Sequence, residues 1–143
     1  NTGKRMVKSP KVYFIDTGLV SSLTGINSKD MYRRGPMYGA IFENYVISEI
    51  RKRFLHTGKR VDLSFYRTSH GQEVDLVVEI GSQHFCAEIK ASHTFKPGMF
   101  DPIRKMPADV SDIAYLIYQG ESLPSSQNRQ VVDYAEFLEK RIP

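Results

Sequence analysis

The most regular pattern of apolar and polar positions lies in the first half of the chain, over residues 37–54. Apolar side chains recur there at intervals of three and four residues, which is the spacing of one face of an α-helix. They are Phe42, Val46, Ile47, Ile50 and Phe54. The pattern predicts a long helix that buries this face and ends at Gly58.

A different pattern follows, in which apolar and β-branched residues predict two or three strands, over residues 61–67, 73–80 and 84–91. The last two are separated by a short connection that begins with a glycine, so we expect them to form a hairpin. Pairing across this turn places position i opposite a position near 164 minus i. Asp75 is therefore expected beside Glu88.

The N-terminal region shows weaker signals. Residues 11–15 are rich in β-branched and aromatic side chains, which predicts a strand. Residues 16–18 (Asp-Thr-Gly) offer side-chain oxygens that suit a helix N-cap, so a short helix over residues 19–23 should follow and stop at Gly25. The polar, basic stretch 27–36 is expected to be a loop.

The C-terminal third predicts a mixture of short elements. After Pro97 we expect a short helix over residues 99–106 and then a buried strand over residues 113–118. The polar stretch 121–130 is expected to be a loop. The valine pair at 131–132 predicts an edge strand, and residues 134–141 predict a C-terminal helix.

The composition fits one globular domain. The chain has 143 residues, of which 41% are hydrophobic and 25% charged, which is enough for a core and argues against extensive disorder. No apolar run approaches the roughly 18 residues of a membrane span. Cys86 is the single cysteine, which excludes an internal disulfide. We therefore expect a soluble, cytoplasmic protein.

The charge is distributed unevenly along the chain. Residues 1–67 contain 13 Lys and Arg against 5 Asp and Glu, a net +8, whereas residues 68–143 contain 7 against 11, a net −4. This polarity suits a surface that binds phosphate groups beside a carboxylate site. The alternative is that each basic run is a solvated face. The candidate nucleic-acid contacts are Arg51, Lys52, Arg53 and Arg67.

The predicted hairpin carries the candidate chemistry. Because side chains alternate along a strand, Asp75 should share a face with Glu73, Val77 and Glu79, opposite Val74, Leu76, Val78 and Ile80. On the partner strand Cys86, Glu88 and Lys90 should share a face. The register then places Asp75, Glu88 and Lys90 together. Paired carboxylates are hard oxygen ligands that suit Mg²⁺ or Mn²⁺. The alternative is a cross-strand charge cluster on the surface.

A helical carboxylate adds to this group. Glu43 lies at the helical phase of Val46, Ile47 and Ile50, so its side chain should be on the buried face. A charge on that face needs a partner. The site hypothesis provides one in the form of a metal ion. The alternative is that Glu43 pairs with an arginine or caps a backbone group.

These residues resemble a known motif. Val74-Asp75 followed by Glu88-Ile89-Lys90 resembles the PD-(D/E)XK motif of the restriction-endonuclease-like nuclease superfamily, with Val74 in place of the motif's proline. The wider pattern is similar to the C-terminal domain of a group of prokaryotic AAA-type ATPases. It comprises residues 8–19 (KSPKVYFIDTGL), residues 39–46 with Phe42-Glu43-Asn44, then Tyr66-Arg67, Glu73-Val74-Asp75 and Ala87-Glu88-Ile89-Lys90.

The resemblance implies a fold, a site and a context. The fold would be α/β (α+β), with a central mixed β-sheet flanked by helices and a restriction-endonuclease-like core. Residues 1–143 would form one nuclease-like domain, with 1–10 as the tail of a preceding segment and an ATPase module earlier in a longer chain. Asp75, Glu88, the Ile89 carbonyl and Glu43 would hold Mg²⁺ or Mn²⁺, and Lys90 would be the catalytic lysine.

The sequence is consistent with two hypotheses of function. The first is a Mg²⁺-dependent nuclease acting on DNA or another nucleic acid. The second is a non-catalytic module that binds nucleic acid or protein and serves the attached ATPase. Other chemistry has less support, because no P-loop motif occurs and the four histidines lack metal-ligand spacing. We expect these histidines, which are His56, His70, His84 and His93, to be surface or turn residues.

Overall fold

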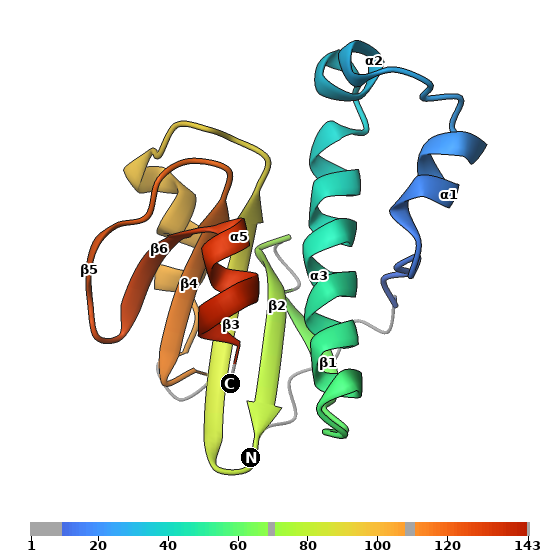
Figure 1. Ribbon diagram of the computed structural model, residues 1–143. Coiled ribbons are helices and arrows are strands. Elements are labelled where there is room, and N and C mark those ends of the chain that lie inside the picture. The colour runs from blue at the N-terminus through green and yellow to red at the C-terminus, as the bar shows by residue number, and fades with distance from the viewer. Residues whose placement is uncertain (1–9, 69–70, 108–110, 143) are drawn as a thin grey trace.

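A mixed six-stranded β-sheet forms the centre of the molecule (Figure 1). The computed structural model describes residues 10–142, with gaps at 69–70 and 108–110. The strand order is β1-β2-β3-β4-β6-β5, in which β3, β4 and β6 run parallel and the other neighbours are antiparallel. The strands are β1 (Leu63–Arg67), β2 (Glu73–Ile80), β3 (Gln83–Lys90), β4 (Ile113–Tyr118), β5 (Leu123–Ser126) and β6 (Arg129–Asp133). The predicted mixed sheet flanked by helices is confirmed.

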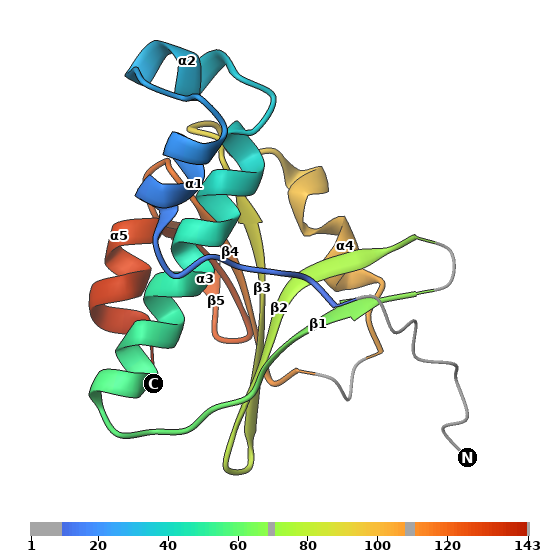
Figure 2. The ribbon, with the colours of Figure 1, turned by 90° about the vertical axis from the view of Figure 1, so that its right-hand side faces the viewer.

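Helices cover both faces of the sheet, as Figure 2 shows. One face carries α3 (Tyr38–His56) and the C-terminal helix, which begins as α5 (Tyr134–Glu136) and continues as the π-helical η2 (Phe137–Arg141). The other face carries the 3-10 helix η1 (Pro97–Phe100) and α4 (Asp101–Arg104). The sheet therefore separates two apolar clusters, of which the one under α3 is the larger. Of the described helices, none is both long and apolar enough to cross a bilayer.

Helix α3 confirms the long helix that the apolar pattern over residues 37–54 predicts. The five apolar residues that define its predicted face are all buried under the sheet. The helix ends at His56, with Thr57 as its C-cap, and Gly58 follows with a φ of 73°. A left-handed φ is accessible to glycine without a Cβ clash, which explains why the chain can turn there.

The β2–β3 hairpin is also confirmed, with a register one residue from the predicted one. Val77 pairs with Cys86, whereas the predicted pairing would have placed it opposite Ala87. Regular pairing runs from Ile80↔Gln83 to Leu76↔Ala87. The two strands leave this ladder just before Asp75 and Glu88, so the candidate site lies where β2 separates from β3.

An irregularity in β2 corrects the predicted alternation. Between Ser64↔Val77 and Tyr66↔Val74, two steps along β1 correspond to three along β2, which is the signature of a β-bulge. Leu76 packs in the cluster under α3, whereas Val74 packs in the cluster on the opposite face. The prediction that they share a face was wrong, because the extra residue reverses the alternation beyond it.

The N-terminal region differs from the predictions in two elements. Residues 11–15 form an extended segment without strand pairing. The Asn44 side chain of α3 serves as its partner, since it accepts from the Phe14 amide (2.7 Å) and donates to the Phe14 carbonyl (2.8 Å). Helix α1 (Thr17–Leu23) follows with Asp16 as its N-cap, as predicted. The expected loop at 27–36 contains a second helix, α2 (Lys29–Arg34), which Ser28 caps.

The C-terminal region was predicted in part. Strand β4 has its predicted bounds, and residues 134–141 are helical. The helix predicted over residues 99–106 is present two residues earlier, as the consecutive η1 and α4 over residues 97–104. Strand β5 was missed, because residues 123–126 (LPSS) are too polar to give an apolar run. As a result β6 is an interior strand, with β4 and β5 on either side, and not the predicted edge.

Candidate functional site

Asp75 occupies the point where β2 leaves β3. Its side chain substitutes for the missing backbone ladder, because Oδ2 accepts a hydrogen bond of 2.9 Å from the Ile89 amide. This contact fixes the Asp75 carboxylate against β3. The donor, Ile89, lies between Glu88 and Lys90 in the sequence. Asp75 is 8% exposed, so its charge lies close to the apolar interior.

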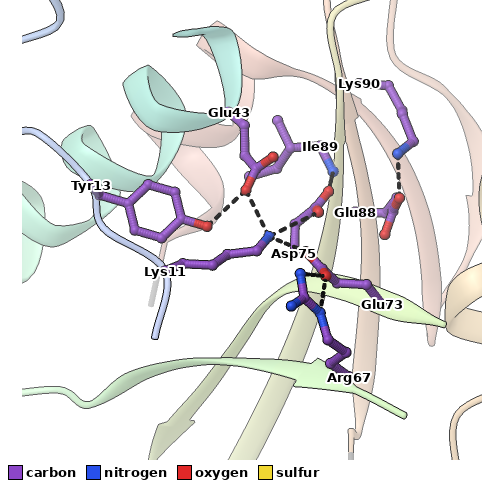
Figure 3. Close-up of polar contacts among 9 residues, drawn as sticks. All are labelled: Lys11, Tyr13, Glu43, Arg67, Glu73, Asp75, Glu88, Ile89 and Lys90. Atoms are coloured by element: carbon purple, nitrogen blue, oxygen red, sulfur yellow. Dashed lines mark hydrogen bonds and ion pairs between the residues drawn. The ribbon is translucent and has the colours of Figure 1, made fainter. Parts of the chain in front are cut away.

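A lysine that the sequence analysis did not select lies among the acidic residues (Figure 3). The Lys11 ammonium is 3.0 Å from Glu43 Oε1 and 3.7 Å from Asp75 Oδ1, and it also pairs with Glu73. The Tyr13 hydroxyl donates a 2.7 Å hydrogen bond to the same Glu43 oxygen. Carboxylates from α3 and β2 are therefore joined through one cation.

Glu88 and Lys90 form the second part of the site. Alternation along β3 places both on the side of Cys86, and the Lys90 ammonium pairs with Glu88 Oε1. Glu88 is only 3% exposed, and its other oxygen, Oε2, is the single buried side-chain polar atom of the described residues without a hydrogen-bond partner. In Figure 3 Asp75 lies between this pair and the Lys11 group.

The two buried carboxylates are difficult to ionise. Burial, followed by the nearby charge of Asp75, raises the pKa of Glu88 to about 7 in spite of Lys90. Burial and the charge of Glu43 likewise raise the pKa of Asp75, although the Ile89 amide opposes this shift. Carboxylates with raised pKa values that lie close together are typical of functional sites.

The two lysines of the site, unlike the buried carboxylates, are stabilised in their charged form. Burial favours the neutral form of Lys11, but its hydrogen bonds to Glu73 and Glu43 outweigh burial and raise the pKa of Lys11. The pKa of Lys90 is raised in the same manner by Glu88. Both ammonium groups are thus held in their charged form, and together they offset part of the negative charge of the four acids.

The carboxylates of the site are the kind of ligand that a divalent cation prefers, but they are not arranged around one point. Asp75, Glu88 and Glu43 supply hard oxygens, and the unpartnered Glu88 Oε2 is a free ligand atom. Within the described residues, however, no three Asp, Glu, His or Cys side chains are grouped closely enough to hold an ion. Lys11 already contacts Glu43 and Asp75, whereas Glu88 Oε2 has no partner.

The predicted site residues lie near one another at one end of the hairpin, but the predicted common face is not kept. Glu88 and Lys90 point to the side of Cys86, whereas Lys11 joins Asp75 to Glu43 on the side of α3. Of the predicted nucleic-acid contacts, Arg67 lies at the edge of this group and the other three lie apart from it. Arg67 pairs with Glu73, at 2.5 Å through Nε. Arg51, Lys52 and Arg53 follow Glu43 on α3 by two turns or more, about 12 Å along the helix axis. Lys52 pairs with Glu49.

Three residues of the site were missed, namely Lys11, Tyr13 and Glu73. A signal existed for the first two, because alternation in residues 11–15 places Lys11 and Tyr13 on one side of an extended segment. Nothing in the sequence pattern says that this side faces Glu43. Of the histidines predicted at the surface or in turns, His56 and His93 are exposed, whereas His84 is half-buried in β3. His70 lies outside the described residues, as do residues 1–9 of the predicted tail over residues 1–10.

Comparison with known proteins places the chain in a family. Residues 38–137 match the family described as a domain of unknown function, DUF4143. The chain belongs to this family. The matched residues include Glu43, Asp75, Glu88 and Lys90, whereas Lys11 precedes them. The DUF4143 domain therefore supplies the acids and Lys90, and the segment before it supplies the second ammonium.

Two mycobacterial proteins are similar over most of the chain. They are the uncharacterized protein Rv2008c of Mycobacterium tuberculosis and the uncharacterized protein Mb2031c of Mycobacterium bovis. Each is 33% identical over 123 residues, which cover 85% of this chain and 26% of the relative. The chain thus spans about a quarter of the length of these curated relatives.

Proposed function

We propose that this DUF4143 domain is a nuclease-like module that uses Mg²⁺ or Mn²⁺ to hydrolyse phosphodiester bonds in DNA or another nucleic acid. The observation that carries the proposal is the Glu88 carboxylate, which is buried beside Asp75 with one oxygen unpartnered. Leaving such an atom unsatisfied costs about 1–3 kcal/mol, so its retention favours a ligand that satisfies it.

Each residue has a distinct role in this proposal. Asp75 and Glu88 would hold the ion, with the Ile89 carbonyl and Glu43 as further ligands. When bound, the ion supplies a more acidic water and offsets the phosphate charge. Lys90 is held beside Glu88, where its ammonium can stabilise negative charge that develops on the phosphate. The order Asp75, Glu88, Lys90 matches the nuclease motif that the sequence resembles.

We further propose that the domain serves an AAA-type ATPase module of the same parent protein, with the described domain as one unit of it. The resemblance of residues 8–19 and 39–46 to the C-terminal domain of such ATPases supports this proposal. The curated relatives are about four times as long as the matched region, which leaves room in them for a module of that size.

Calorimetric titration with Mn²⁺, paired with a plasmid-nicking assay, tests the proposed activity. Asp75→Asn should abolish both metal binding and nicking, because it removes ligand charge. Lys90→Ala should abolish nicking but keep or slightly raise the metal affinity, since it removes a cation from the site. Glu139→Gln, at an exposed position of η2, is the control and should match the wild type. Metal binding that survives Asp75→Asn would refute the assignment of the ligands.

A second candidate is a non-catalytic module that binds nucleic acid or protein on behalf of the ATPase. The contacts of Lys11 favour it, because an ammonium already neutralises Glu43 and Asp75 as an ion would. A domain that binds Mn²⁺ but cuts no nucleic acid, even when joined to its ATPase, would support this second function over the first.

A further inference from the structure

The acidic end of the hairpin already contains a cation of its own. Lys11 Nζ contacts carboxylates from two separate elements, Glu43 on α3 and both Glu73 and Asp75 on β2. Its side chain is 18% exposed, so water screens these contacts only in part. The ammonium thus occupies the position between Glu43 and Asp75 where a bound ion would contact both.

The position of the Lys11 ammonium is also fixed by contacts of the neighbouring residues with α3. Residues 11–15 dock across α3, and the Asn44 amide clamps the Phe14 backbone through two hydrogen bonds. One residue before this clamp, Tyr13 shares Glu43 Oε1 with Lys11. Figure 2 shows the segment running from α1 past α3 towards β1 and β2. Lys11 therefore reaches the carboxylates as part of the docked segment over residues 11–15, which we call the strap.

The Glu88 side of the site differs, because one of its carboxylate oxygens has no partner. Lys90 engages Oε1 of Glu88, but Oε2 is buried and unpartnered. The site thus consists of a half that Lys11 neutralises, with Glu43 and Asp75, and a half with an open ligand atom. A divalent ion placed in the first half would lie within about 4 Å of an ammonium, and like charges at that distance oppose binding by more than tenfold.

We propose that Lys11 is the resident cation of the Glu43–Asp75 half and competes there with a divalent ion. This inference rests on the proposed metal site and adds its regulation. While the strap over residues 11–15 is docked, an ion can use Glu88 and one side of Asp75 but not the full set of acids. Because such coupling is reciprocal, full occupancy by metal loosens the strap by the same factor.

The test compares Mn²⁺ affinity by calorimetric titration in the wild type and Lys11→Met, which keeps the length of the side chain and removes its charge. Lys140→Met, at an exposed position of η2, is the matched control. Lys11→Met should bind Mn²⁺ about tenfold more tightly than the wild type or better, and the control should not differ. Should Lys11→Met fold poorly, Lys11→Met combined with Glu73→Gln keeps the net charge of the cluster. This variant should still bind Mn²⁺ more tightly than the wild type, but by a smaller factor, because Glu73→Gln removes an attractive charge near the ion.

The outcomes separate this inference from the proposed function. If the variant binds Mn²⁺ and the wild type does not, the inference stands, and the metal-dependent activity of the wild-type domain fails. If both bind with equal affinity, the proposed metal site stands and competition by Lys11 is refuted. If neither binds, both fail. Weaker binding by Lys11→Met would also refute the inference, because Lys11 would then support the ion.

Discussion

At the scale of single residues, Glu88 is a buried carboxylate with one unpartnered oxygen. A carboxylate that is 3% exposed loses most of its hydration, and one ammonium satisfies only one of its oxygens. The fold therefore favours protonation of Glu88, whose pKa rises to about 7 from an ordinary value of 4.5. A metal ion would reverse this preference, since ligands bind metals in their deprotonated form.

This shift predicts how the stability of the metal-free domain depends on pH. A carboxyl whose pKa is higher in the folded state stabilises the fold fully below pH 4.5, and this stabilisation is lost as the pH rises through about 7. Relative to Glu88→Gln, the wild type should therefore lose about 3 kcal/mol of unfolding free energy between pH 4.5 and 8. Urea denaturation at several pH values measures the difference.

Glu121→Gln, which changes an exposed carboxylate, is the matched control. A difference between the wild type and Glu88→Gln that does not change with pH would show that burial leaves the titration of Glu88 unaltered. The carboxyl would then be ionised throughout by its pairing with Lys90.

At the scale of elements, the docked segment over residues 11–15 shows how a side chain can take the place of a neighbouring strand. Asn44 provides both the acceptor and the donor that a strand would offer to Phe14. Asn44 is 7% exposed, so these bonds lie in a largely dry environment. The apolar side chains of Val12 and Ile15 face outward, with 79% and 67% exposed, and contribute little burial. The attachment therefore depends on polar contacts and on Tyr13, which packs against the cluster under α3.

Asn44→Ala should release this segment. The loss of both hydrogen bonds leaves the Phe14 backbone without these partners, which should cost about 1–3 kcal/mol of unfolding free energy. Limited proteolysis should then cut within residues 10–16 faster than in the wild type. Asn27→Ala, at an exposed position, is the control. Unchanged proteolysis in Asn44→Ala would show that Lys11 and Tyr13 hold the segment without the clamp.

The elements that the sequence predicted well are those with a clear period. Helix α3 and the β2–β3 hairpin have long apolar patterns, and burial of those patterns leaves one arrangement for each element. The segment at 11–15 has the composition of a strand, yet strand formation also requires a neighbour with free backbone groups. Strand β5 shows the converse, because pairing with β6 makes a strand of a polar sequence.

At the scale of the whole molecule, the distribution of charge predicts a salt-dependent interaction with nucleic acid. Arg51 and Arg53 are exposed on α3 within the basic half of the chain. If both contact phosphates, replacing both with glutamate should weaken binding to DNA at low salt. It should also reduce the slope of log affinity against log salt by about 2, since each contact contributes about 0.9.

Fluorescence anisotropy with a labelled duplex measures this slope. Lys140→Glu, which changes one exposed charge on η2, is the control and should alter neither affinity nor slope by a comparable amount. An unchanged slope in the Arg51→Glu, Arg53→Glu variant would place the nucleic-acid surface elsewhere on the domain and leave this face of α3 as solvated charge.

The sequence by itself indicated Glu43, Asp75, Glu88 and Lys90 as candidates for the site. Helical phase directed Glu43 inward, and strand alternation kept Glu88 and Lys90 on one side of β3, because these periods are local properties of the backbone. Only the tertiary structure decided the remaining features. The bulge in β2 reversed the expected face of Val74, the end of the ladder fixed Asp75 on the Ile89 amide, and the Asn44 clamp brought Lys11 to Glu43. Each depends on contacts between residues far apart in the chain, whose geometry no local period encodes.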